Sequence, residues 1–157
     1  MKCVKVKRKD LIFDNKAVEQ CKSCKRYGKK ATCPPYAVSI KDLKYKYGLM
    51  CYKKFKIDDI KNWKKLSIES SLMLHNLLID KRNQLFLEGH YFAVAFGAGS
   101  CKLCVKCSFP CRFPERSITP VEAIGLNIVK LMKKYCKINL KFPVKKYFYR
   151  VGMILYD

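Results

Sequence analysis

Four cysteines near the two-thirds point of the chain carry the clearest chemical signal in the sequence. They stand in the run GSCKLCVKCSFPCRFP at positions 99–114, and their spacing is C-x2-C-x2-C-x3-C. Bacterial ferredoxins use this spacing to hold an iron–sulfur cluster, because two-residue spacers in a tight turn point successive thiolates at a common centre. The spacing favours a [4Fe-4S] cluster over zinc, and either over a patch of reduced thiols or disulfides. The candidate ligands are Cys101, Cys104, Cys107 and Cys111.

A second group of cysteines lies in the run CKSCKRYGKKATCPPY at positions 21–36. A C-x2-C pair is a common two-ligand unit for zinc or iron, and a third cysteine here precedes two prolines that stiffen the backbone. Gly28 suits the positive φ that would let this segment fold back. The candidate ligands are Cys21, Cys24 and Cys33.

Seven cysteines are one short of two four-cysteine sites. In the two-cluster ferredoxin pattern the fourth cysteine ligates the other cluster, so Cys111 is expected to join the thiols of positions 21–33. The other site then needs a ligand from Cys3, Cys51, Cys136 or a non-cysteine group, or it stays open. An open iron would permit catalysis, whereas closed sites would indicate electron transfer. The two histidines, His75 and His90, are expected to pack or to lie at the surface.

Length and composition indicate one globular metal-binding domain spanning residues 1–157, with 50% hydrophobic residues. The first residues are charged and lack the apolar segment of a signal peptide, and no apolar stretch is long enough to span a membrane. We therefore expect a soluble cytoplasmic protein whose ten cysteines are reduced, with Cys51 a buried thiol in a strand. Abundant cysteine in a reducing compartment indicates metal binding or redox chemistry.

The charge balance is strongly basic, with 34 Lys and Arg against 12 Asp and Glu, a formal net charge of +22. Such a field attracts polyanions, but a lysine-rich composition spread along the chain accounts for the charge equally well. We expect weak, non-specific nucleic-acid binding at most. Aromatic residues are interleaved with lysines at 45–56 and 145–150, which is compatible with base stacking but is more typical of ordinary strands.

The hydrophobic pattern predicts a mixed sheet of about four strands with three helices, an α/β or α+β fold whose two cysteine loops share one metal-binding edge. A capping box at Thr119-Pro-Val-Glu122 predicts that a helix starts there, with a core-facing stripe running to Tyr135. Strands are expected within 2–13 and at 47–56, 91–96 and 147–156. Helices are expected at 39–46 and from Asp58 to Gly89, the latter with a break near Ser67–Ser71.

Several chemistries find no support in the sequence. It contains no G-x4-G-K-[ST] or G-x-G-x2-G loop for a nucleotide phosphate, and no C-x2-C-H for covalent haem. The cysteine order also differs from the C-x3-C-x2-C of radical SAM enzymes. Without an embedded Ser/His/Asp motif, a conventional hydrolase is not indicated.

The two cysteine runs in combination, followed by C-R-x-P and by P-x-E-A-x-G at positions 120–125, resemble the DUF2284 family. These are uncharacterised, predicted metal-binding proteins, mostly of archaea and anaerobic bacteria, and the resemblance extends from about Asp10 to Asp157. It implies that all seven candidate cysteines occupy the family's cysteine positions, but it implies no reaction. Where many relatives read E-A-C-G, this chain has Ile124 in place of the cysteine, so that ligand is absent here.

Three functions follow as hypotheses. The first is a protein with one or two iron–sulfur clusters that acts in electron transfer, or as an accessory to an anaerobic redox enzyme, with an unspecified redox partner protein. The second is a structural zinc module with a basic nucleic-acid-binding surface. The third is an enzyme with an open iron site. The sequence does not indicate an oligomeric state.

Overall fold

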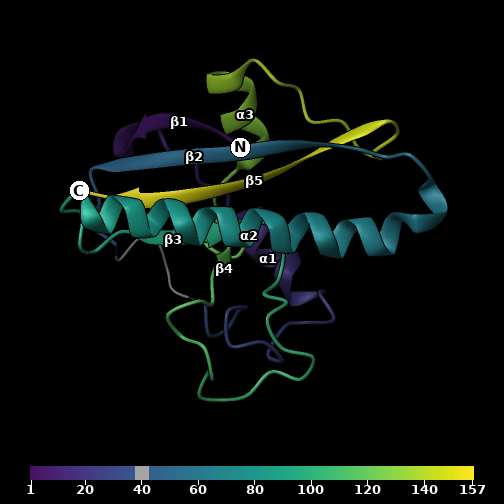
Figure 1. Ribbon diagram of the computed structural model, residues 1–157, viewed down its shortest axis with the longest axis horizontal. Coiled ribbons are helices and arrows are strands. Elements are labelled where there is room, and N and C mark those ends of the chain that lie inside the picture. The colour runs from purple at the N-terminus through teal and green to yellow at the C-terminus, as the bar shows by residue number, and fades with distance from the viewer. Residues whose placement is uncertain (38–42) are drawn as a thin grey trace.

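The computed structural model describes residues 1–37 and 43–157 (Figure 1). Within these ranges, no helix is both long and apolar enough to cross a membrane. The elements in chain order are strand β1 (Lys2–Lys7), a 3-10 turn (Arg8–Asp10), helix α1 (Asn15–Lys22), strand β2 (Tyr47–Lys56), a second 3-10 turn (Ile60–Asn62), helix α2 (Trp63–Leu87), strands β3 (Val94–Gly97) and β4 (Thr119–Pro120), helix α3 (Ile128–Cys136) and strand β5 (Tyr147–Tyr156).

The described strands form one mixed sheet in the order β1-β2-β5-β3-β4. All neighbours are antiparallel except β3 and β4, which run in parallel. The long β2–β5 pair forms the centre, and both strands have the predicted bounds, 47–56 and 147–156. The mixed α/β class and the three helices are therefore confirmed, and the predicted count of four strands is one too low.

Both faces of the sheet are buried, which explains why β5 is apolar at nearly every position. Its alternate residues Met153 and Leu155 pack with Leu131 of α3 and with the turn that precedes that helix. Ile154, on the opposite face, packs with Leu74 and Leu78 of α2. Figure 1 shows α3 on one side of the β2–β5 pair and α2 running along the other.

The uncounted strand, β4, occupies the place where a helix start was predicted. Thr119 pairs with Phe96 of β3, and the amide of Val121 donates to the carbonyl of Gly97 at 2.9 Å. Pro120 tolerates this edge position because it needs no hydrogen bond from its own nitrogen. A tight turn follows, in which Gly125 has φ +80, and the helix starts only after Asn127, whose side chain accepts from the amide of Lys130.

Other helical predictions also need correction. Helix α2 runs without the expected break, because Ser70 and Ser71 lie in its buried face and their hydroxyls are hydrogen-bonded. Gly89, with φ +97, follows its end as predicted. Helix α1 was not predicted, although Asp14 caps it by accepting from the amide of Lys16. Of the helix expected at 39–46, residues 39–42 lie outside the described ranges and 43–46 are not helical.

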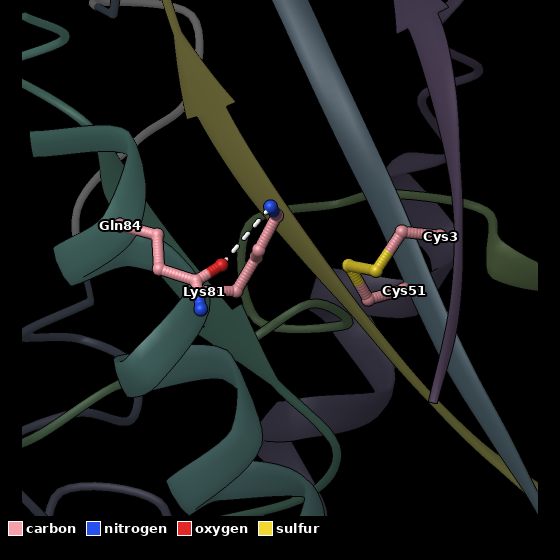
Figure 2. The surroundings of a disulfide bond; sticks show 4 residues. All are labelled: Cys3, Cys51, Lys81 and Gln84. Atoms are coloured by element: carbon pink, nitrogen blue, oxygen red, sulfur yellow. Dashed lines mark hydrogen bonds between the residues drawn. A yellow bond between two sulfur atoms is a disulfide. The ribbon is translucent and has the colours of Figure 1, made fainter. Parts of the chain in front are cut away.

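Two of the cysteines that were expected to be reduced form a disulfide. Cys3 in β1 and Cys51 in β2 are register partners on adjacent antiparallel strands, with their Cα atoms 4.1 Å apart. Figure 2 shows the bond between the two strands, with α2 and its Lys81–Gln84 hydrogen bond in the same view. Cys51 is fully buried, as predicted, but it is not a free thiol, and neither cysteine is available as a metal ligand.

Candidate metal centre

The two cysteine loops extend from the same end of the fold. The second loop, residues 98–118, leaves β3 and returns through β4, so its two ends lie on adjacent strands. The first loop, residues 21–37, starts in the last turn of α1. That helix is held against the turn after β4 by a hydrogen bond from the amide of Asp14 to the carbonyl of Gly125, at 2.8 Å. Figure 1 shows both loops extending below the sheet.

The four thiols of the second loop line one small cavity, and the first loop forms part of its wall. The amide of Ala31 donates to Sγ of Cys107 at 3.4 Å, and Nζ of Lys30 donates to the carbonyl of Cys104 at 3.5 Å. Burial raises the pKa of the Cys101 thiol, and its neighbours Cys111 and Cys104 raise it further. The lining residues are Lys30, Ala31, Thr32, Cys101, Leu103, Cys104, Cys107, Cys111 and Phe113.

The three thiols of the first loop form a separate neighbourhood. Burial raises the pKa of Cys33, and interactions with Cys24 and Cys21 add to the effect. The pKa of Cys21 is raised by burial, then by the carboxylate of Glu122 and by Cys24. The amide of Gly28, at φ +66, donates to the carbonyl of Pro34 and closes the loop. Glu122 thus lies next to this thiol group.

The arrangement differs from the expected exchange of ligands between the loops. Cys111 faces the cavity of its own loop, so the seven candidates divide into four and three. Within residues 1–37 and 43–157, no three His, Cys, Asp or Glu side chains are grouped closely enough to hold a metal ion. The donor set nevertheless suits a thiophilic metal or cluster, since the cavity is lined by four cysteine sulfurs and apolar side chains.

The remaining candidates for ligands lie elsewhere. Nε2 of His75 donates to the carbonyl of Arg116 at 2.7 Å and ties α2 to the end of the second loop. The ring of His90 packs against Tyr156, and the thiol of Cys136 interacts with Tyr52 of β2. Both histidines therefore have packing partners, and for His75 packing was one of the two roles expected.

Three charged residues that were not predicted to belong to the site lie at the base of the loops. Lys102 donates to Oγ of Ser71 at 3.2 Å and to the carbonyl of Ser100 at 3.1 Å. Arg150 of β5 donates to Ser67 and Ser70 of α2. Burial lowers the pKa of both cations, and each lies near Glu122, which the cations stabilise in its charged form.

Glu122 is exposed as a residue, yet burial of its carboxyl group raises the pKa of that group. It had been interpreted as part of a helix cap, and no local signal indicates that it lies next to Cys21. Its position results from the parallel pairing of β4 with β3, which sets the turn after β4 against the second loop. Residues such as this one are found only from the tertiary arrangement.

Fold and site define a cysteine-rich α/β protein with two neighbouring thiol groups at one end of a mixed sheet. The family model described as "Predicted metal-binding protein (DUF2284)" matches residues 4–156, essentially the whole chain, and the chain belongs to this family. No match was found among curated proteins or among solved structures.

Proposed function

We propose that this metal-binding protein holds a [4Fe-4S] cluster through Cys101, Cys104, Cys107 and Cys111 and acts in electron transfer or as an accessory to an anaerobic redox enzyme. The observation that carries the proposal is that these four thiols, in the ferredoxin spacing, line a single cavity. When bound, such a cluster supplies one-electron chemistry.

The residues around the cavity support this assignment. The N–H of Ala31 points at Sγ of Cys107, and hydrogen bonds to ligand sulfurs are a principal means by which proteins tune cluster potentials. Lys30 and Lys102 place positive charge near the thiols, which would offset the negative charge of a cluster and its four thiolates. Leu103 and Phe113 contribute apolar lining that restricts water.

The first loop supports a second, less complete centre. Its three thiols leave one coordination position for Glu122, for water or for a substrate. A second cluster there would serve electron transfer, whereas an iron with an open position would make the protein an enzyme. The proximity of Glu122 is the one observation that favours the enzymatic alternative.

The zinc module with a nucleic-acid surface receives less support. In that function, aromatic rings of β2 and β5 would stack on bases. In the structure these rings pack against each other instead. Phe55 stacks on Phe148 with centroids 5.3 Å apart, and Tyr52 contacts Tyr149 at 6.3 Å.

The decisive experiment is anaerobic purification followed by iron, sulfide and zinc analysis and an absorption spectrum. We expect brown protein whose broad visible absorption is bleached by dithionite, with iron and sulfide in equal amounts. Colourless protein with stoichiometric zinc and no sulfide would refute the cluster and favour the zinc module.

Single substitutions test the division into four and three thiols. Cys107→Ala and Cys111→Ala should each lower iron and sulfide at the same centre, and the double variant should lose little more, because one missing ligand already disrupts the unit. Cys33→Ala should leave that centre's spectrum intact. If Cys111→Ala and Cys33→Ala instead deplete one shared centre, the assignment of Cys111 to its own loop is wrong.

A further inference from the structure

The two cysteine loops expose several large apolar side chains. Val105 is fully exposed at 107%, and Tyr36 and Phe109 are exposed at 54% and 51%. The rings of Tyr36 and Phe109 touch across the two loops, with centroids 4.9 Å apart, so the patch is continuous from one loop to the other. Phe113, in the same loop as Phe109, also lines the four-thiol cavity. Contiguous exposed apolar surface of this kind marks interaction sites.

Exposed cations lie in the same two loops as these apolar side chains. Residues 21–37 and 98–118 contain nine Lys and Arg but a single acidic residue, Glu115, whereas the whole chain has 34 against 12. The ratio of basic to acidic residues is thus higher in the loops than in the chain as a whole. The exposed cations are Lys22, Lys25, Arg26, Lys29, Lys106, Arg112 and Arg116.

Ion pairs do not neutralise this charge in the part of the chain that the structure describes. The three salt bridges found there join Lys56 to Asp58, Lys65 to Glu69 and Lys134 to Asp10, all outside the loops. Within the second loop, Arg112 donates to the carbonyl of Lys106 at 2.8 Å, which fixes one cation beside the apolar patch without cancelling it.

We infer that this surface, the cysteine-loop face, docks an acidic protein over the proposed cluster. The inference rests on the proposed function, because it assigns the electron-transfer partner to the face that covers the four-thiol cavity. An apolar centre with a charged rim is the anatomy of protein–protein interfaces, and charge complementarity speeds the encounter. Electron-transfer encounters also use small interfaces, in keeping with a face built from two loops.

An acidic protein fits the face better than a nucleic acid does. Its exposed apolar side chains include an aliphatic one, Val105, and two rings that already pack on each other, Tyr36 and Phe109. Single-stranded nucleic acids are held by free aromatic faces on which bases stack, together with a basic groove. A fully exposed aliphatic side chain cannot stack on a base. In a protein interface, by contrast, it packs against apolar side chains of the partner.

The test uses anaerobically purified full-length protein and, as the probe, a plant-type [2Fe–2S] ferredoxin, a small acidic redox protein. Binding is measured by isothermal titration calorimetry at low and at raised salt, after iron and sulfide have been counted on the same sample. The double variant Lys29→Glu/Lys106→Glu reverses two exposed rim charges. The control, Lys64→Glu/Lys133→Glu, makes the same change of net charge on α2 and α3, and Val105→Ser removes apolar contact without altering charge.

We expect the rim variant to weaken ferredoxin binding by about tenfold or more, the control by less than about threefold, and Val105→Ser to weaken it at both salt concentrations. Equal losses in the rim variant and the control would overturn the inference, because only net charge would then matter. It would also be overturned if the rim variant lost affinity for a poly(U) oligonucleotide and kept its affinity for ferredoxin. Absence of iron and sulfide would refute the proposed function instead, and the metal count separates that failure from a failure of docking.

Discussion

Replacing Gly152 by alanine tests whether β5, β3 and α2 pack as closely as the structure indicates. A Cβ at this position would lie 2.7 Å from the carbonyl oxygen of Phe96 in β3 and in overlap with the Cδ1 methyl of Leu78 in α2, with the other methyl at 3.1 Å. The Leu78 side chain can shift, but the Phe96 carbonyl is backbone and moves only with its strand. Overpacking of a core costs 1–3 kcal/mol, and the backbone contact puts Gly152→Ala near the upper end, at about 3 kcal/mol.

Urea unfolding measures this cost, with the fluorescence of the single tryptophan, Trp63, as the probe because its ring packs on Phe148 of β5. With an m-value of about 2 kcal/mol/M, the midpoint should fall by about 1.5 M at equal metal content. In a Leu78→Ala background the same glycine substitution should cost less, since one of the two overlaps is gone. A midpoint for Gly152→Ala within about 0.3 M of the wild type would refute the close packing.

Three further outcomes are expected. Burial lowers the pKa of His75, so below pH 6.5, the ordinary pKa of histidine, the unfolded state takes up a proton that the folded state does not. The free energy of unfolding should therefore fall as the pH drops through 6.5. Urea titrations from pH 7.5 to 5 should show this fall, and His75→Gln should flatten it. Reductant should lower the urea midpoint of the wild type but not that of Cys3→Ser. The reason is that the disulfide between Cys3 and Cys51 closes a span of 48 residues, which stabilises the fold by about 4 kcal/mol by restricting the unfolded chain. If reductant changes the midpoints of both proteins equally, no such bond forms. Arg150→Met should lower the free energy of unfolding by about 2 kcal/mol, because the buried Ser70 hydroxyl loses the donor that Arg150 provides. Arg150→Lys should lose less, because the lysine can still donate. Thermal unfolding measures both, and variants as stable as the wild type would contradict this prediction.

The parts of the fold that local pattern determines were predictable. Strand β5 is a nearly continuous run of apolar residues that includes aromatic and β-branched side chains, strand β2 is rich in aromatic residues, and both have the predicted bounds. The prediction at Thr119 was wrong for a physical reason: its capping box is a local preference, and hydrogen bonding to β3 outweighed it. Likewise Ser70 and Ser71 indicated a break in α2, but the break is avoided because Arg150 and Lys102, distant in sequence, donate to their hydroxyls.

The candidate site shows the same limit. The spacing of the seven cysteines predicted two thiol groups, because ligand spacing is a local property of a loop. Which thiols face one another depends on the tertiary structure and not on spacing within a loop. Cys111 was expected to join the thiols of the first loop, whereas it lines the cavity of its own loop. Glu122, Lys102 and Arg150 were not singled out, because only the order of the strands brings them together.

The central position of β5 has a consequence for how the protein is made. On the ribosome β1 and β2 emerge first and β3 and β4 later, and β5 is the last of the five to be synthesised. Among the described strands it alone joins the β1–β2 pair to the β3–β4 pair, so this sheet stays in two unconnected pieces until residues 147–156 have left the exit tunnel. All seven loop cysteines have been translated by residue 111. The thiols of both loops are therefore synthesised before the sheet that supports them is complete.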